Sequence, residues 1–489
     1  MPNHKPHDRH HPVARQLPFF IGLLTLIFSS CQPAIISTAP AIPATSTTRA
    51  ARAIIETQPI SDGPVLLRTG ITIRNFAQTD AGSIKLALHP QTDDLYILSP
   101  SSGLHRLKMD PSSPVENVAN PTDIVDDASL SGMAFGPDGT LFVVANRTVE
   151  RIYNQSIIRA GTANENGIFT WKTLAQSEPY PLSGTPFDHR FGGIAVSSDG
   201  KTVYVSSGSR TDHGEVEDNS FNFQDTREVG LTAKIFQIPA DSEDLTLAND
   251  EEALKAQGLI FAWGTRNAYD MAFAPNGDLF AIDNGPDADF PDELNWLREG
   301  NHYGFPWRFG EQDNPQQFPE YTGVDDKRLS PDFTAVQSGT YRTDPTFPPA
   351  PGNFTAPVAN LGPDAAHYRA EDGSEHNAAK EGVPLTTFTP HRSPLGLVFS
   401  TSPKMPADFR SDENAFGAFI LSWGAAGGTL MDKGQDLLYL KLTKRGDNYE
   451  TTATQIAREF KNPIDSILIE NRLYILEFGT GTIWELTFE

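Results

Sequence analysis

Residues 269–285 read YDMAFAPNGDLFAIDNG, two short apolar runs on either side of a polar turn. Alternation with a period of two predicts β-strands, because successive side chains of a strand point to opposite faces of a sheet. Asn276 and Gly277 lie between the two runs and favour a tight turn, since both residue types accept a positive φ. The stretch is therefore predicted to be a β-hairpin.

The same unit recurs five more times along the chain. The copies are Ser83–Ser99, Leu130–Asn146, Phe191–Gly208, the less regular Ser393–Gly424, and Pro463–Gly479. Six hairpins with strand-bearing segments between them predict an all-β, six-bladed β-propeller in which each hairpin forms the inner strands of one blade. Two separate β domains are the alternative, but residues 60–489 contain no linker that would divide them.

The remaining segments add little regular structure to this prediction. The chain contains 39 Gly and 38 Pro among 489 residues, which suits short strands separated by turns. The long gap from Gly310 to Leu385 is expected to hold outer strands of one blade and extended loops over one face. A short helix is expected only around Glu251–Ala256.

The first 58 residues have a different character. A basic leader and the apolar run LPFFIGLLTLIF (Leu17–Phe28) come before two serines and Cys31, the single cysteine of the chain. This order predicts a signal peptide over residues 1–31 whose end resembles a bacterial lipobox, although Phe28 stands where that pattern prefers leucine. An ordinary signal peptide with an incidental cysteine is the alternative. Residues 32–58 are rich in Pro, Ala, Ser and Thr and predict a flexible tether before a propeller over residues 59–489.

The charge balance limits the partners. A formal net charge of -24 argues against nucleic acid and against an anionic membrane surface, because both require clustered basic residues. Because of the leader, the sequence predicts an exported protein of the cell envelope or periplasm. Because of the charge, the membrane contact is expected only through a lipid on Cys31. The domain after Cys31 has no cysteine and hence no disulfide.

The hairpin of residues 269–285 runs directly into an acidic loop. Five carboxylates, Asp283, Asp287, Asp289, Asp292 and Glu293, alternate there with Gly285, Pro286 and Pro291. Calcium takes six to eight oxygen ligands from carboxylates and carbonyls, so such a loop is a candidate site for it. The spacing does not fit an EF-hand, and a solvated acidic loop is the alternative.

Several short motifs together resemble one family. They are FDHRFGG (Phe187–Gly193), GTRN (Gly264–Asn267), NGPDADFPDELN (Asn284–Asn295), GNHYGFP (Gly300–Pro306) and HRSPLGLVF (His391–Phe399). The chain resembles the glucose/sorbosone dehydrogenase family over most of residues 60–487. Members are soluble quinoprotein propellers that use pyrroloquinoline quinone (PQQ) and calcium. The resemblance implies a PQQ-dependent dehydrogenase that oxidises a sugar and passes the electrons to an external acceptor.

The resemblance assigns roles to individual residues. His189 matches the general base that takes the proton from the anomeric hydroxyl, a task that suits an imidazole. Arg266 and Asn267 match the pair that contacts PQQ. The list of implied calcium ligands is the carbonyls of Gly285 and Pro286 at the cofactor, and Glu293 and Tyr303 at a second, structural site, Tyr303 through its carbonyl. A structural role is expected for His213 and His302.

Other positions depart from the family pattern. Trp423 and Gly424 stand near the place of a cofactor-binding lysine, and Asn462 and Ile464 replace a pair of arginines. Arg392 is a candidate to replace part of this lost positive charge. These departures leave a second hypothesis open, a non-catalytic, calcium-stabilised propeller that binds a glycan or a protein at the cell surface. A serine hydrolase or a nicotinamide enzyme is not indicated, because neither G-x-S-x-G nor G-x-G-x-x-G is present in the required context.

Overall fold

The six predicted hairpins are the framework of the protein. The computed structural model describes residues 63–110, 112–424 and 430–489, so the leader and the tether predicted for residues 1–58 lie outside the described residues. All six hairpins form where they were predicted, each as an antiparallel strand pair. We number the sheets one to six by the hairpin that begins each of them.

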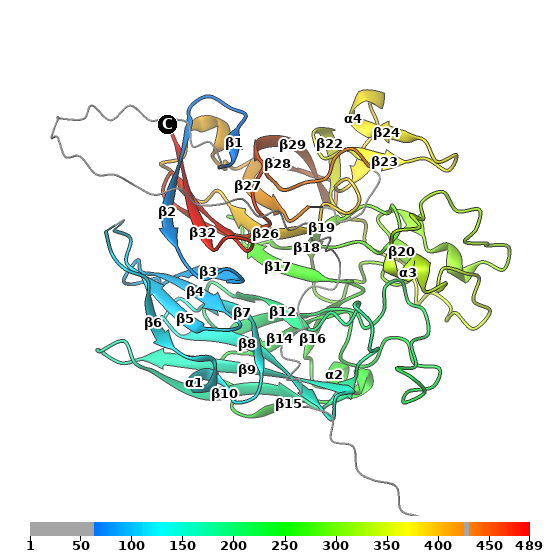
Figure 1. The fold of residues 1–489 in the computed structure, drawn as a ribbon, viewed down its shortest axis with the longest axis horizontal. Helices are drawn as coiled ribbons and strands as arrows, with labels where there is room; N and C mark the ends of the chain where they lie inside the picture. Colours follow the sequence, from blue (N-terminus) through cyan, green and yellow to red (C-terminus); the bar gives the residue numbers. More distant parts are fainter. Residues whose placement is uncertain (1–62, 111, 425–429) are drawn as a thin grey trace, which may run out of the picture.

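Six sheets of three or more strands follow one another along the chain (Figure 1). Sheet one contains β3 (Lys85–Leu88), β4 (Leu95–Ser99), β5 (Gly103–Leu107) and β6 (Glu116–Ala119). Sheet two contains β7 (Ser129–Phe135), β8 (Leu141–Val149), β9 (Tyr153–Ala163) and β10 (Phe169–Ser177), with β11 (Tyr180–Pro181) beside β9 and β15 (Leu245–Leu247) beside β10. Sheet three contains β12 (Phe191–Val196), β13 (Thr202–Ser207), β14 (Lys234–Pro239) and β16 (Ile260–Trp263).

The other three sheets complete the circuit. Sheet four contains β17 (Ala268–Phe273), β18 (Leu279–Asp283) and β19 (Glu293–Leu297). Sheet five contains β26 (Pro394–Phe399), β27 (Ala415–Ser422), β28 (Asp436–Arg445) and β29 (Asn448–Arg458), joined by β22 (Ala359–Pro363), β25 (Leu385–Thr386) and β1 (Val65–Leu66). Sheet six contains β30 (Pro463–Ile469), β31 (Arg472–Glu477), β32 (Thr482–Phe488) and β2 (Ile71–Gln78). Pairing of β2 with β32 joins the two ends of the described chain in one sheet.

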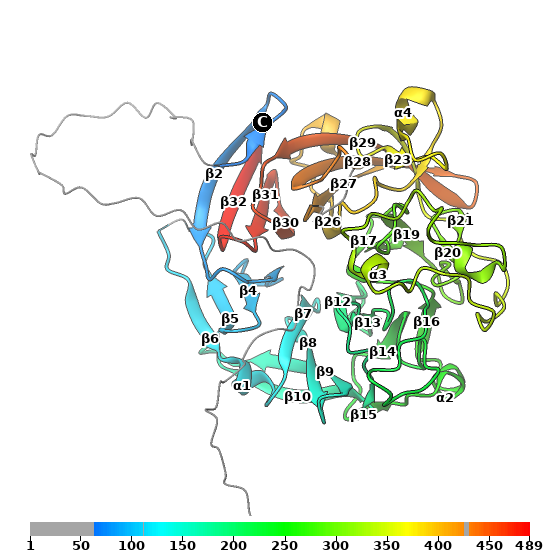
Figure 2. The same cartoon turned by 45° about the vertical axis from the view of Figure 1, so that its right-hand side comes forward.

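The first strands of the hairpins form a closed ring. Contacts run from β3 to β7, β12, β17, β26 and β30, and from β30 back to β3. Figure 2 shows the sheets arranged around this ring. The all-β propeller predicted from the sequence is confirmed. Five sheets have four or more strands, and sheet four has three.

Helices are few and short. The helix α2 (Glu251–Ala256) has the predicted bounds, but the expectation of a single helix is wrong, because the single turns α1 (Pro121–Ile124), α3 (Thr334–Gln337) and α4 (Ala378–Glu381) also form. The segment between residues 310 and 385 contains β22 and β25, which extend sheet five, as expected. It also contributes to two small hairpins, β20 (Arg308–Phe309) with β21 (Gln312–Asp313) and β23 (His367–Arg369) with β24 (Glu375–Asn377). In the described part of the chain no helix is long and apolar enough to cross a membrane.

The hydrophobic core lies between neighbouring sheets. Separate buried clusters join sheets two and three, three and four, four and five, and five and six. At one place the inner strands β7 and β12 approach so closely that a side chain is excluded. A Cβ on Gly132 of β7 would lie 2.0 Å from the carbonyl oxygen of Gly192 in β12, so only glycine fits there.

A buried ionic cluster crosses the propeller axis. The ammonium of Lys85, on sheet one, lies 3.0 Å from Asp270 on sheet four and 4.0 Å from Asp465 on sheet six. Asp270 also accepts the amide of Leu397 on sheet five, and Asp465 accepts the amide of Leu86. Four of the six sheets are thereby linked through three side chains.

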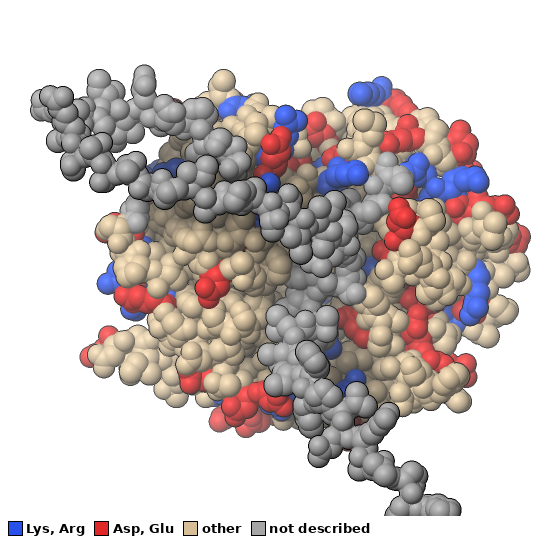
Figure 3. Space-filling model, in the orientation of Figure 1, with Lys and Arg blue, Asp and Glu red and all other residues tan. Residues whose placement is uncertain are grey.

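Surface charge agrees with the composition. Figure 3 shows Asp and Glu spread over the visible face with Lys and Arg among them, and the described residues form no continuous basic patch on that face.

Candidate functional site

The candidate residues gather at one face of the propeller because of strand direction. His189 precedes β12 and Arg266 precedes β17, two neighbouring inner strands. The strands β13 and β18 run antiparallel to them and end at that same face, after which come Asp212 and Gly285. The motifs separated in sequence are therefore brought together between sheets three and four.

His189 is held in one orientation and one tautomer. Its Nδ1 lies 3.3 Å from Oγ of Ser209, and that hydroxyl donates its hydrogen to the carbonyl of Thr211 at 2.7 Å. The hydroxyl oxygen must therefore accept the Nδ1 hydrogen of His189, which leaves Nε2 without a proton. Burial, and then the nearby guanidinium of Arg266, lower the pKa of His189 to about 3. The imidazole is consequently neutral at ordinary pH and Nε2 is available as a base.

Asp188 does not orient this imidazole. Its carboxylate accepts the backbone amides of Ser183 and Gly184 at 2.7 and 2.9 Å, so it shapes the preceding turn instead. The sequence did not identify Ser209 as the partner of His189. The signal was present in the hairpin: Phe191 pairs with Ser207, so the same register places Ser209 opposite His189.

Arg266 is buried and fixed on three sides. Its Nε and Nη2 donate to the carbonyl and to Oδ1 of Asp212, both at 2.7 Å, and Nη1 donates to the carbonyl of Asn284 at 3.2 Å. A guanidinium has five N–H groups. Among the described residues these bonds occupy three of them, which leaves one N–H on each terminal nitrogen for a ligand. Such a pair of donors matches a carboxylate.

Asn267 shares the support of its neighbour. The backbone amides of Arg266 and Asn267 donate to the two carboxylate oxygens of Asp283, at 2.9 and 2.5 Å. The side-chain amide of Asn267 donates to Oδ1 of Asn284 at 3.1 Å. One carboxylate at the end of β18 thus fixes the turn that carries both predicted cofactor-binding residues.

Three of the four predicted metal-binding residues surround one small cavity. This partly open space of about 10 Å³ is lined by Gly264, Arg266, Asp283, Asn284, Gly285, Glu293, Tyr303, Phe305, Arg308 and Phe309. It is about the space that one water molecule or one cation needs. Pro286 does not line it. The phenol of Tyr303 donates to the carbonyl of Trp296 at 2.6 Å, so its carbonyl is the candidate ligand.

The ionised forms of the carboxyl groups at this cavity are disfavoured. Burial, and then the neighbouring Asp283, raise the pKa of Glu293 to about 8, and burial raises the pKa of Asp283 to about 6. A bound cation would relieve this repulsion. Across residues 63–110, 112–424 and 430–489, no group of three or more His, Cys, Asp or Glu side chains is arranged to hold a metal ion. Backbone carbonyls would therefore have to complete the coordination.

The proposed replacement of lost positive charge by Arg392 is wrong. Its guanidinium is buried, lies 2.6 Å from Asp436 and also pairs with Asp432. These two aspartates neutralise its charge. Trp423 instead packs against the ring of Phe478, with centroids 5.1 Å apart, and its carbonyl accepts the side-chain amide of Asn462. Ile464 is buried in the core.

Comparison with known proteins agrees with the motifs. Residues 125–330 match the family model described as Glucose / Sorbosone dehydrogenase. The resemblance to that family is confirmed. Every candidate site residue lies inside the matched segment, whereas Arg392, Trp423 and Asn462 lie outside it.

Relatives and solved structures extend this result. Quinoprotein glucose dehydrogenase B of Acinetobacter calcoaceticus is 26% identical over 255 residues, which cover 46% of this chain. The chain spans about half the length of that curated relative, 50%. The soluble aldose sugar dehydrogenase of Escherichia coli superposes with a TM-score of 0.54 at 14% identity, over 86% of this chain and 100% of the other. The PQQ domain of pyranose dehydrogenase from Coprinopsis cinerea gives 0.55 at 12% identity, over 88% and 98%. At these identities the structures establish the propeller fold alone.

Proposed function

We propose that the protein is a PQQ- and calcium-dependent dehydrogenase that oxidises the anomeric or aldehyde carbon of a sugar. The observation that carries the proposal is the geometry of His189, whose unprotonated Nε2 lies in the segment that matches the sugar dehydrogenase family. The family match and the quinoprotein relative support the reaction class. We count the three-stranded sheet four, which carries much of the site, as a full blade, so that the propeller has six blades.

The chain's own residues perform the proton transfer. Nε2 of His189 accepts the proton of the anomeric hydroxyl while hydride leaves the adjacent carbon, so that a lactone and a protonated imidazole result. Ser209 keeps the accepting nitrogen free by holding the other one protonated. When bound, PQQ supplies the acceptor for the hydride, and calcium beside it favours the negative charge that arrives.

The residues present fit an acidic planar cofactor on the side of sheets three and four. Arg266 has two N–H donors left for a carboxylate, and Asn267 lies beside it. The carbonyls of Gly285 and Pro286, with Glu293 and the carbonyl of Tyr303, offer oxygen ligands of the kind that calcium requires. On the side of sheets five and six, Trp423 and Asn462 offer no charge, so we expect weaker PQQ binding than a full set of cations would give.

Ser209→Ala is expected to reduce turnover without loss of cofactor. The change removes the acceptor for the Nδ1 hydrogen of His189, and mutation of such a supporting partner costs about 10-fold or more in activity. Steady-state dye reduction should therefore show a lower kcat, at an unchanged PQQ concentration for half-maximal activity. An unaltered kcat in the variant would show that Ser209 does not set the tautomer.

The function itself is tested by titrating PQQ into the purified protein with calcium present. Dye reduction with a panel of aldoses should require both additions. Arg266→Lys keeps the positive charge but loses the paired donors, so it should raise the PQQ concentration needed for half-maximal activity about 10- to 100-fold. Activity without added PQQ, or an unchanged PQQ concentration for half-maximal activity in Arg266→Lys, is inconsistent with this cofactor site.

The engagement of Arg392 by two aspartates favours a second candidate function. With that charge consumed and Trp423 and Asn462 neutral, the pocket could have lost the cofactor while the protein kept a calcium-stabilised propeller for binding a glycan or a protein. Its signature would be a calcium-dependent rise in melting temperature with no PQQ binding at micromolar concentration.

We further propose that the protein is exported and held in the cell envelope through a lipid on Cys31. The charged and apolar leader before Cys31 and the Pro/Ala/Ser/Thr segment after it support this location. The partners of the reaction would then be a small sugar and an external electron acceptor. Metabolic labelling with palmitate, compared between the natural chain and Cys31→Ala, tests the anchor.

A further inference from the structure

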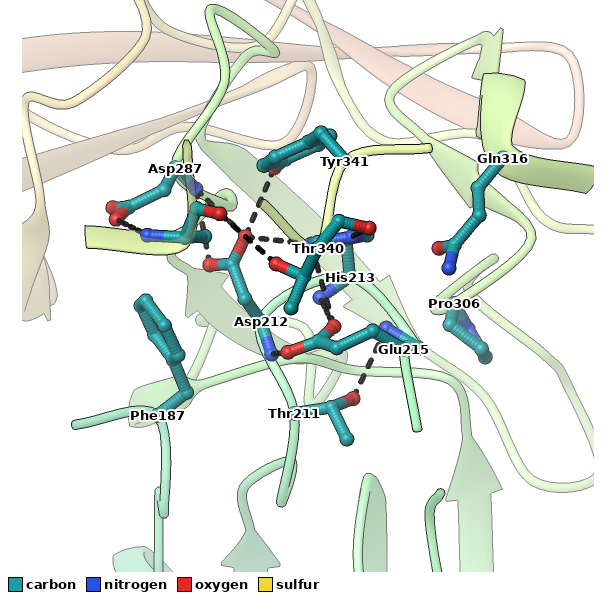
Figure 4. Close-up of polar contacts among 12 residues, drawn as sticks. Phe187, Thr211, Asp212, His213, Glu215, Asp287, Pro306, Gln316, Thr340 and Tyr341 are labelled. Carbon is teal, nitrogen blue, oxygen red and sulfur yellow. Dashed lines mark hydrogen bonds and ion pairs between the residues drawn. The ribbon is translucent and has the colours of Figure 1, made fainter. Parts of the chain in front are cut away.

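Asp212 lies at the centre of a buried polar network beside the candidate site. Its Oδ1 accepts Nη2 of Arg266 at 2.7 Å and the amide of Asp287 at 3.0 Å. Its Oδ2 accepts Nδ1 of His213 and the phenol of Tyr341, both at 2.9 Å. Figure 4 shows Asp287, His213 and Tyr341 around the carboxylate of Asp212.

The four partners come from separate parts of the chain. Arg266 precedes β17 of sheet four, Asp287 follows β18, and Tyr341 belongs to the long segment before sheet five, whereas His213 is the residue after Asp212. The ring of Tyr341 stacks on that of His213, with centroids 3.8 Å apart. Asp212 is therefore the point at which the long segment, sheet three and the acidic loop are fastened together.

Asp212 is itself held rigidly. The carboxylate of Glu215 accepts the backbone amides of Asp212 and His213 at 2.8 and 2.7 Å. Asp212 and His213 are fully buried, and Glu215 is nearly so. Burial alone would raise the pKa of Asp212, but the charges of Arg266 and His213 hold it well below its usual range. A fixed anion at this place can direct its partners.

The contacts of Asp212 set the orientation of two groups, the guanidinium of Arg266 and the carbonyl of Pro286. By engaging Nε and Nη2 of Arg266, Asp212 turns the remaining N–H pair of the guanidinium away from itself. By holding the amide of Asp287, it also fixes the peptide that contains the carbonyl of Pro286. In a trans peptide the N–H and the C=O point in opposite directions, so this carbonyl points away from Asp212.

We infer that Asp212 is a positioning residue that aims Arg266 at a cofactor carboxylate and the Pro286 carbonyl at calcium. This inference rests on the proposed function. One carboxylate then prepares both binding sites, so that loss of its charge weakens PQQ and calcium together. Asp212 touches neither ligand and acts only through Arg266 and the peptide of Pro286.

Asp212→Asn tests this role, because it keeps the size of the side chain and removes the charge. Two equilibrium measurements on the purified apoprotein apply, fluorescence quenching by PQQ with calcium present and calorimetry with calcium alone. Both dissociation constants should rise about 10- to 100-fold, as for other groups that support metal ligands. A merely structural role would lower the melting temperature or the active fraction and leave both constants unchanged.

Tyr341→Phe is the matched control. It removes one hydrogen bond to the same buried carboxylate but leaves the contacts to Arg266 and Asp287, so both constants should change less than about threefold. If Asp212→Asn does not fold, Glu215→Gln is the substitute, because it weakens the hydrogen bonds that the backbone amides of Asp212 and His213 donate to Glu215. Both dissociation constants should then rise together, by a smaller factor.

The outcomes separate this inference from the proposed function. If the natural protein binds PQQ and calcium and folded Asp212→Asn binds them equally well, the positioning role is refuted and the dehydrogenase proposal stands. A loss confined to one of the two ligands also overturns the inference. If the natural protein binds no PQQ, both proposals fall.

Discussion

Replacement of His189 by alanine should lower kcat/KM about 10²- to 10⁴-fold, the range that a positioned general base contributes. No second base can take over readily, because Asp188 is bonded to two backbone amides and His213 is buried against Asp212. The measurement is dye reduction at saturating PQQ and calcium. PQQ affinity should stay within about threefold, since the ligand contacts of Arg266 do not involve the imidazole.

The pH profile gives an independent reading of the same residue. With a pKa of about 3, His189 remains unprotonated far below the ordinary value of 6.5. A general base acts in its unprotonated form, so kcat/KM of the natural protein should hold steady as the pH falls to about 5. An acid limb centred near 6.5 would mean that the imidazole is freely solvated, contrary to its burial beside Arg266.

The control for His189→Ala is Gln91→Ala, a change at an exposed loop position far along the chain from the site. Melting temperatures of both variants should remain near that of the natural protein, because among the described residues the imidazole of His189 makes one side-chain hydrogen bond, to Ser209 at 3.3 Å. Full activity in the alanine variant would remove His189 from the mechanism.

Of the substitutions discussed, replacement of Lys85 by methionine should lower the free energy of unfolding most. The variant keeps the length of the side chain but leaves Asp270 and Asp465 facing each other without the ammonium. Removal of one partner from a buried ion pair costs about 3–5 kcal/mol, because an uncompensated charge stays buried. Urea unfolding monitored by intrinsic fluorescence measures the loss, provided that the transition is two-state.

The loss should depend on pH in a defined direction. Burial, with a smaller contribution from Asp270, already raises the pKa of Asp465 from 3.8 to about 7 despite the presence of Lys85. A carboxyl whose pKa is higher in the folded state binds more protons there, so its contribution to stability falls as the pH rises through this window. Without Lys85 the fall should steepen. The difference in free energy of unfolding between the variant and the natural protein should therefore be smallest near pH 4 and largest at pH 7 or above.

Lys201→Met serves as the comparison for Lys85→Met. Its ammonium pairs with Asp199 at 3.5 Å, but both side chains are largely exposed. Such surface pairs contribute about 0–1 kcal/mol, so this variant should unfold nearly as the natural protein does. Equal effects of the two substitutions would show that the cluster at the axis contributes no more than a surface pair.

The propeller could be predicted because its signal is repeated and local. Each hairpin, such as Tyr269–Gly285, carries its own alternation and turn, and six copies leave little choice of architecture. The short helix Glu251–Ala256 was also predictable, since Asp250 caps it through the amide of Ala253. The ionic cluster around Lys85 was not, because it joins residues on opposite sides of the ring whose separation in sequence carries no signal.

The site was predictable where a motif carries it. Arg266, Asn267, Gly285 and Glu293 lie close together in the structure, and their roles stay predictions. Asp212 and Tyr341 were missed because their roles depend on one segment folding back over another, 129 residues away. Arg392 was misjudged for a related reason: a sequence reveals a charge but not the aspartates that neutralise it.

The central claim is that His189 removes the proton from a sugar while the electrons pass to bound PQQ. The most direct test is the absorption spectrum of the PQQ- and calcium-loaded protein, recorded without oxygen after a single addition of an aldose. We expect rapid reduction of the bound cofactor in the natural protein. In His189→Ala we expect the same bound cofactor, reduced at least about 100-fold more slowly. Reduction at equal rates in both proteins, or no reduction in either, would contradict the account.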